Sequence, residues 1–100
     1  MAAYVIVEIS VHNPVEYEEY KKLSLPSLSP FGGKFIVRGG NTMTLEGDWR
    51  PERMVVLEFP TKEKALEWWN SDIYAVAKAI RQRTAETKMI VVEGCGFIIR

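Results

Sequence analysis

The chain is poor in the residues from which metal centres, disulfides and nucleophilic sites are built. Among its 100 residues there is one cysteine, Cys95, and one histidine, His12. A single cysteine cannot close an internal disulfide and is typical of a reducing compartment, so we expect a cytoplasmic protein. One histidine and one cysteine also give no paired spacing for a zinc site. We therefore predict that the protein uses neither a metal nor a cofactor.

An excess of one charge and long apolar runs are also missing. The 13 basic and 13 acidic side chains cancel to a formal net charge of zero. Without a basic stripe to meet a phosphate backbone, we do not expect nucleic acid as a partner. The apolar runs are far shorter than a membrane span, and a strand begins almost at the first residue. We therefore expect neither a membrane segment nor a signal peptide.

The sequence does contain enough apolar residues for one globular domain. A hydrophobic share of 47% is too high for a disordered chain, and 100 residues leave no room for a second domain. We predict a single domain over residues 1–100, with a core of about 4–93 and a C-terminal tail of 94–100. The pattern predicts strands at 4–11, 34–38, 53–59 and 87–93, and the second strand is expected to continue to 42–46 after a bulge at Gly39-Gly40. A first helix is predicted to open at Asn13-Pro14 and to end at Pro26 and Pro30. A second helix is capped by Thr61, and after a break at Asn70-Ser71-Asp72 a last helix covers 73–84.

This order, βαββαβ, is that of the ferredoxin-like α+β fold with a four-stranded antiparallel or mixed sheet. Right-handed crossovers would place the first and third strands side by side and parallel in the middle of the sheet. The second and fourth strands would be the antiparallel edges.

The strands are apolar on both faces, although two helices can cover only one. In the third strand, for example, Val55 and Leu57 face one way while Met54 and Val56 face the other. An uncovered apolar face predicts a homodimer that packs sheet on sheet. The tail residues 97–99 would either add a strand to the partner's edge or fold back on their own subunit.

Polar residues of three strands form the first candidate site. If the predicted pairing holds, they converge at one end of the sheet and comprise Glu8, Ser10, His12, Arg38 and Glu58. One interpretation is a pocket mouth in which His12 or Glu58 is a catalytic base, Arg38 anchors an anion, and Glu8 and Ser10 bind the ligand. The alternative is an ion-pair network that fixes the register of the dimer.

Aromatic residues of the second half form another candidate site. Trp69 and Tyr74 flank the predicted helix break, where they would form a wall for a planar organic ligand. The alternative is that these rings are core between helices and sheet. Trp49, in the turn before the third strand, is expected to be partly exposed or docked on the partner.

Several short motifs, taken together in their order and spacing, resemble the domain-of-unknown-function 1330 family. They are Phe31-Gly32-Gly33, Arg38-Gly39-Gly40, Leu45-Glu46-Gly47-Asp48-Trp49, Leu57-Glu58-Phe59-Pro60 and Trp69-x-Ser71-x-x-Tyr74. The resemblance covers about residues 4–93. It implies a dimeric α/β barrel of ferredoxin-like subunits, within a superfamily that includes cofactor-independent monooxygenases and isomerases. It implies fold and assembly, not an activity.

Three functional interpretations stay open at this point. In the first, the protein is a small homodimer that binds a small organic molecule, with an anion as the favoured candidate, and performs cofactor-independent chemistry on it, such as isomerisation or oxygenation. In the second, it binds such a molecule without catalysis, as a binding or stress-related module. In the third interpretation it is a structural dimer whose polar cluster only fixes the interface.

Overall fold

The computed structural model describes residues 1–95 and contains four strands and four helical segments there. The elements, in chain order, are β1 (Ala3–Val11), α1 (Pro14–Leu28), the 3₁₀ turn η1 (Ser29–Phe31), β2 (Lys34–Arg38), β3 (Arg53–Phe59), α2 (Lys62–Trp69), α3 (Asp72–Thr84) and β4 (Ala85–Glu93). The predicted fold is confirmed: this is a ferredoxin-like α+β domain with one sheet. The prediction for the tail residues 97–99 lies outside the described residues.

The sheet has the strand order β2-β3-β1-β4, and every neighbouring pair is antiparallel. The central position of β1 and β3 is confirmed, but their predicted parallel pairing is wrong. The crossover through α1 makes β1 and β2 run in the same direction with one strand space between them. The hairpin partner β3 fills that space and therefore runs the opposite way, with Tyr4 opposite Glu58 and Ile9 opposite Arg53.

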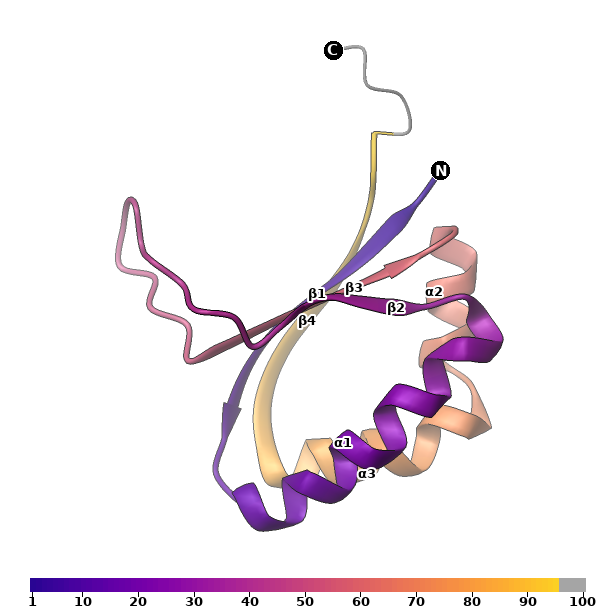
Figure 1. The fold of residues 1–100 in the computed structure, drawn as a ribbon, viewed down its shortest axis with the longest axis horizontal. Coiled ribbons are helices and arrows are strands. Elements are labelled where there is room, and N and C mark those ends of the chain that lie inside the picture. The colour runs from indigo at the N-terminus through magenta and orange to yellow at the C-terminus, as the bar shows by residue number, and fades with distance from the viewer. Residues whose placement is uncertain (96–100) are drawn as a thin grey trace.

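All helices lie on one face of the sheet (Figure 1). The side chains of β1 alternate accordingly: Val5, Val7 and Ile9 are buried beneath the helices, while the residues between them are half-buried. The core between the layers is completed by Phe59, Trp68 and other buried apolar side chains. The predicted core role of the aromatic residues is confirmed for Tyr74, which is fully buried.

The helix starts follow from side-chain caps. Asn13, Thr61 and Ser71 each accept a hydrogen bond from the backbone N–H three residues later. The helix end predicted at Pro26 is wrong, because α1 continues through this residue to Leu28. Burial of the last turn offsets the backbone bond that proline removes, since Leu28 is fully buried.

The chain between β2 and β3, residues 39–52, forms a long arm that projects beyond the sheet (Figure 1). The strand predicted at 42–46 is absent from it, and the β-bulge lies between Phe35 and Val37 instead of at the glycine pair. Gly39 ends β2 with a φ of 75°, and its N–H bonds the Met54 carbonyl at 2.8 Å. At the far end of the arm Leu45 is 92% exposed.

The sheet face opposite the helices is uncovered and largely apolar. We call it the open face; strand register places on it Tyr4, Ile6, Val37, Met54, Val56, Ile90 and Val92, with Glu8, Lys88, Lys34 and Glu58 towards its ends. Within residues 1–95 no helix is long and apolar enough to cross a membrane.

Candidate functional site

The five polar residues predicted to converge are spread over the sheet. Antiparallel pairing places Glu8 opposite Met54 and Glu58 opposite Tyr4, so the two carboxylates share the open face but lie towards opposite ends of it. His12 follows the end of β1, eight residues beyond Tyr4, which is roughly 26 Å along a strand. Within one subunit, His12 and Glu58 therefore do not form a common site.

Arg38 does not pair with either carboxylate. It is exposed, lies opposite Val55, and stacks on the ring of Phe35 with its guanidinium carbon 4.3 Å from the ring centre. Glu58 instead pairs with Lys34 at 3.2 Å. The prediction of a partly buried Arg38 bonded to Glu58 or Glu8 is wrong, because the hairpin register places Arg38 opposite Val55 and brings Lys34 to Glu58 instead.

Glu8 and Ser10 do share a pocket on the open side of the sheet. The Ser10 hydroxyl donates to Glu52 at 2.9 Å, and the Trp49 indole N–H donates to Glu8 at 3.4 Å. Trp49 is 58% exposed, as predicted. The pocket measures about 290 Å³ and is lined by Glu8, Ile9, Ser10, Arg50, Glu52, Glu86, Thr87 and Lys88. Its three carboxylates outnumber its two cations, so it suits an organic anion poorly.

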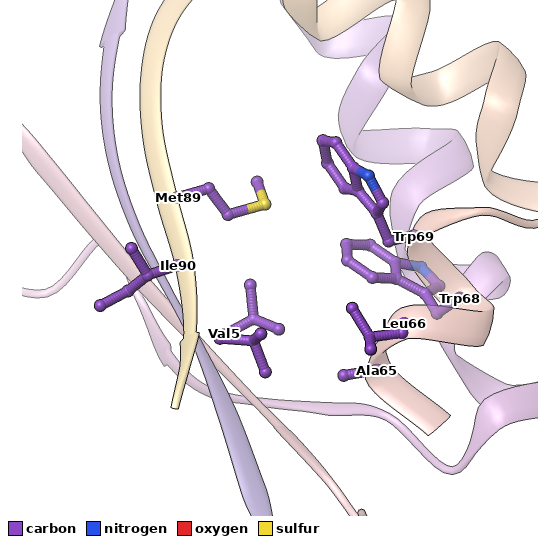
Figure 2. A pocket seen from close by; sticks show the side chains of 8 residues that line it. Val5, Ala65, Leu66, Trp68, Trp69, Met89 and Ile90 are labelled. Atoms are coloured by element: carbon purple, nitrogen blue, oxygen red, sulfur yellow. The ribbon is translucent and has the colours of Figure 1, made fainter. Parts of the chain in front are cut away.

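A second pocket, about 290 Å³, lies between α2 and the β4 side of the sheet. We call it the apolar pocket; its lining consists of Val5, Ala65, Leu66, Trp68, Trp69, Met89, Ile90 and Val91. Figure 2 shows Met89 and Val5 on one wall and the two tryptophans on the other, whereas the Ile90 side chain points away from the space. Of the two rings predicted to form an aromatic wall, Trp69 lines this pocket and Tyr74 does not, and their ring centres are 6.2 Å apart.

A third pocket, about 370 Å³, adjoins the apolar pocket and shares Trp69 and Met89 with it. We call it the polar pocket; its lining consists of Trp69, Arg81, Gln82, Ala85, Thr87 and Met89. Because they share these two residues, the two pockets are neighbours along β4. We call them together the groove, which is apolar at one end and cationic at the other. Arg81 is only 3% exposed, although it is a charged residue.

A hydrogen-bonded pair of tyrosines lies behind the cationic end. The Tyr74 hydroxyl is 2.9 Å from that of Tyr20 and accepts a hydrogen bond of 3.3 Å from Nε of Arg81. Burial raises the pKa of the Tyr74 hydroxyl well above its ordinary value, Tyr20 adds to the rise, and Arg81 opposes it. Tyr74 is therefore neutral at physiological pH and serves as a hydrogen-bonding group that orients Arg81.

The sequence reasoning missed Arg81 and Thr87. A signal for Arg81 was present in the helix period: it lies seven residues after Tyr74 and four after Ala77, on the buried stripe of α3. A charged residue on an apolar stripe is costly unless it serves a partner or a ligand. No comparable signal marks Thr87, since threonine is common in strands.

The described part of the chain offers few groups for metal binding or proton transfer in this groove. Residues 1–95 contain no group of three or more histidine, cysteine or carboxylate side chains placed to hold a metal ion. Neither the apolar nor the polar pocket is lined by a carboxylate, a histidine or a thiol from these residues. What the lining residues of the groove offer is apolar surface, two indoles, a guanidinium, an amide and a hydroxyl.

The fold and groove define the class: a ferredoxin-like α+β domain with one uncovered sheet face. Residues 2–95 match the sequence profile of the Domain of unknown function (DUF1330), and the chain belongs to this family. A search of the curated proteins found no significant match.

Solved structures with the same fold are distant in sequence. A protein of unknown function from Rhodopseudomonas palustris has 19% identity and a TM-score of 0.75, with 93% of this chain and 82% of that chain covered. A dimeric ferredoxin-like protein of unknown function from Jannaschia sp. CCS1 has 14% identity, a TM-score of 0.69 and coverages of 94% and 100%. SnoaB, a cofactor-independent oxygenase from Streptomyces nogalater, has 10% identity, a TM-score of 0.64 and coverages of 99% and 98%. At these identities the similarity shows the fold alone.

Proposed function

We propose that the protein is a homodimer in which each subunit binds one small organic molecule in the groove along β4. The observation that carries this proposal is the apolar pocket, a space of about 290 Å³ walled by Trp68 and Trp69 on one side and the β4 side chains on the other. Protein interiors are close-packed, so an aromatic-walled space of this size suits a ligand better than it suits a core. The planar indoles favour a planar, apolar ligand body.

The open face supports the dimer. Its centre is apolar, and Ile90 at 60% and Val92 at 43% are too exposed for a stable solitary sheet. Its ends carry both charges, Glu8 beside Lys88 at one and Lys34 beside Glu58 at the other. A surface with an apolar centre and balanced charges can pack against a second copy of itself about a two-fold axis. The Jannaschia protein of the same fold is described as dimeric.

Binding is better supported than catalysis. The roles predicted for His12 and Glu58 as catalytic groups stay predictions, as do those of Glu8, Ser10 and Arg38 in ligand binding and the cytoplasmic location. No carboxylate, histidine or thiol from the described residues lines the groove. A cofactor-independent reaction like that named for SnoaB would therefore have to draw its reactivity from the substrate.

The binding proposal is tested by narrowing the apolar pocket. Leu66 lines it and is 42% exposed, so Leu66→Trp should fill the space without disturbing the core. We expect calorimetric titration with a panel of bicyclic aromatic compounds, 2-naphthoate and 2-naphthamide among them, to show binding to the wild type and at least about tenfold weaker binding to Leu66→Trp.

The matched control is Leu23→Trp. Leu23 is a helical leucine of similar exposure, 39%, and it does not line the groove. This variant should bind as the wild type does. If no member of the panel binds the wild type, or if both tryptophan variants bind equally well, the groove is not the ligand site.

A further inference from the structure

We propose that the polar pocket is a carboxylate site, in which Arg81 and Thr87 together bind the acid group of an apolar organic acid. The body of that acid lies in the apolar pocket. This inference rests on the proposed binding function and adds the chemical class of the ligand and the residues that select it.

The first observation is the state of Arg81. Its side chain is 3% exposed, yet no carboxylate among residues 1–95 forms an ion pair with it. Its only side-chain hydrogen bond to these residues runs from Nε to the Tyr74 hydroxyl, so neither terminal nitrogen has an acceptor among them. Buried guanidinium groups are normally paired, because an unpaired one gives up its hydration without return.

The second observation concerns Thr87 and is independent of the first. Its hydroxyl oxygen is fully buried and has no hydrogen-bond partner among the described residues. Thr87 lies opposite Ile9, whose side chain is buried under the helices, so the Thr87 side chain is on that same face of the sheet. Thr87 and Arg81 are both among the residues that line the polar pocket. A residue with an unpaired buried hydroxyl and a guanidinium without a carboxylate partner thus border one space.

The surroundings set the sign of the ligand's charge. The ring of Trp69, which joins the two pockets, has Nζ of Lys78 4.2 Å from its centre and the Arg81 guanidinium carbon 5.9 Å from it. No acidic residue among residues 1–95 lines either pocket to offset these cations. The polar pocket therefore favours an anionic group at the end of the groove.

A carboxylate suits these two partners best. It is planar, and its two oxygens accept from a guanidinium and a hydroxyl at once. A primary amide of the same shape has only one acceptor oxygen, and its NH₂ group would meet a cation. The ligand class that follows is a monocarboxylic acid with a flat or compact apolar body.

The experiment compares 2-naphthoate with 2-naphthamide, which share their ring system and differ in the head group. We expect the wild type to bind the acid about tenfold or more tightly than the amide, since a hydrogen bond to a charged group is worth at least about that factor. Thr87→Val keeps the branched shape and removes the hydroxyl, so it should reduce this preference several-fold. It should also leave the unliganded protein as stable as the wild type or more so, because an unpaired buried group is removed. Arg81→Gln should abolish the preference.

The control is Arg83→Gln, which removes the same charge two residues further along α3. Arg83 is exposed and paired with Glu16, so the preference should stay at the wild-type value. Equal binding of acid and amide to the wild type, with both blocked by Leu66→Trp, would overturn the carboxylate site while leaving the proposed function intact. If no member of the aromatic panel, these two compounds included, binds the wild type, both the carboxylate site and the proposed function are overturned. If Arg81→Gln does not fold, Thr87→Val decides, and an unchanged acid preference in that variant overturns the inference.

Discussion

Tyr74 shows how one side chain serves packing and polar chemistry together. Its ring is fully buried and lies 4.0 Å, centre to centre, from that of Trp68. Its hydroxyl links Tyr20 to Arg81 and so helps to fix the guanidinium that borders the groove. The cost of burying this hydroxyl is offset only while it keeps its proton. The stability of the fold should therefore decrease at alkaline pH.

We predict that the free energy of unfolding falls as the pH rises above about 10. Burial is the main cause that raises the pKa of both Tyr74 and Tyr17 above the ordinary value of 10.0. Above that value the unfolded chain loses these protons while the folded chain keeps them, so the unfolded state binds fewer protons and stability decreases. Below it both states are protonated, and the full stability is present. Urea unfolding monitored between about pH 9 and pH 11 measures the slope.

The variant Tyr74→Phe checks whether this hydroxyl causes the decrease of the free energy of unfolding with pH. It removes the titrating hydroxyl, so its stability should decrease less steeply over the same alkaline range. Tyr4→Phe is the control, because Tyr4 lies on the open face and its replacement leaves Tyr74 and Tyr17 in place. An identical alkaline slope in wild type and Tyr74→Phe would show that the buried hydroxyl does not couple to folding.

At the same scale, the contrast between Arg38 and Arg81 shows what sequence reasoning reached and what it missed. The sequence predicted a cation in the site and placed it at Arg38, because hairpin pairing was expected to bring that residue close to Glu58. The groove cation is Arg81. Its burial depends on which face of α3 packs on the sheet and on how close α2 lies to β4. Trp69 was predicted as a ligand wall and does line the groove, since a local feature, the helix break, marked it.

Among the elements, prediction worked where local chemistry decides. Asn13 and Thr61 are the predicted caps, the predicted break contains the cap Ser71, and β3 has the predicted bounds, because capping residues and alternation act within a few residues. The second strand begins at Lys34 as predicted but lacks its predicted continuation. The direction of β3 relative to β1 depends on the whole chain path and was predicted wrongly. The continuation of α1 past Pro26 depends on tertiary burial of its last turn, which the sequence alone does not display.

The arm depends on one backbone position at its base. Gly39 has a φ of 75°, and a Cβ there would also press on the guanidinium of Arg53, while at Gly40 a Cβ would meet nothing within 4 Å. We therefore predict that Gly39→Ala lowers the free energy of unfolding by about 1–2 kcal/mol, the cost of a left-handed conformation for a residue with a side chain. Gly40→Ala should change it by less than about 0.5 kcal/mol. Chemical denaturation of the two variants gives the comparison, and equal losses at both positions would contradict the role assigned to Gly39.

For the whole molecule, the groove and the open face lie on opposite sides of the same sheet. Side chains of β4 alternate between them: Met89 and Val91 line the groove, while Ile90 and Val92 lie on the open face. The strand that borders the ligand pocket is therefore the strand that would pack on the partner. Dimerisation would hold β4 in place from behind, which gives a physical reason for a small ligand-binding domain to be paired.

The dimer itself is tested most directly at Ile90, which is 60% exposed and points away from the groove (Figure 2). We predict that Ile90→Lys converts the protein from dimer to monomer at micromolar concentration. A two-fold axis places the lysine in the interface twice, so the loss of apolar burial costs at least about 3 kcal/mol per dimer, before any charge repulsion.

The control is Ile73→Lys, at 53% exposure on α3, which should stay dimeric. Light scattering coupled to size exclusion measures the mass of each form. A wild type of one-chain mass would contradict the dimer, and an Ile90→Lys variant that remains dimeric would place the interface away from the open face.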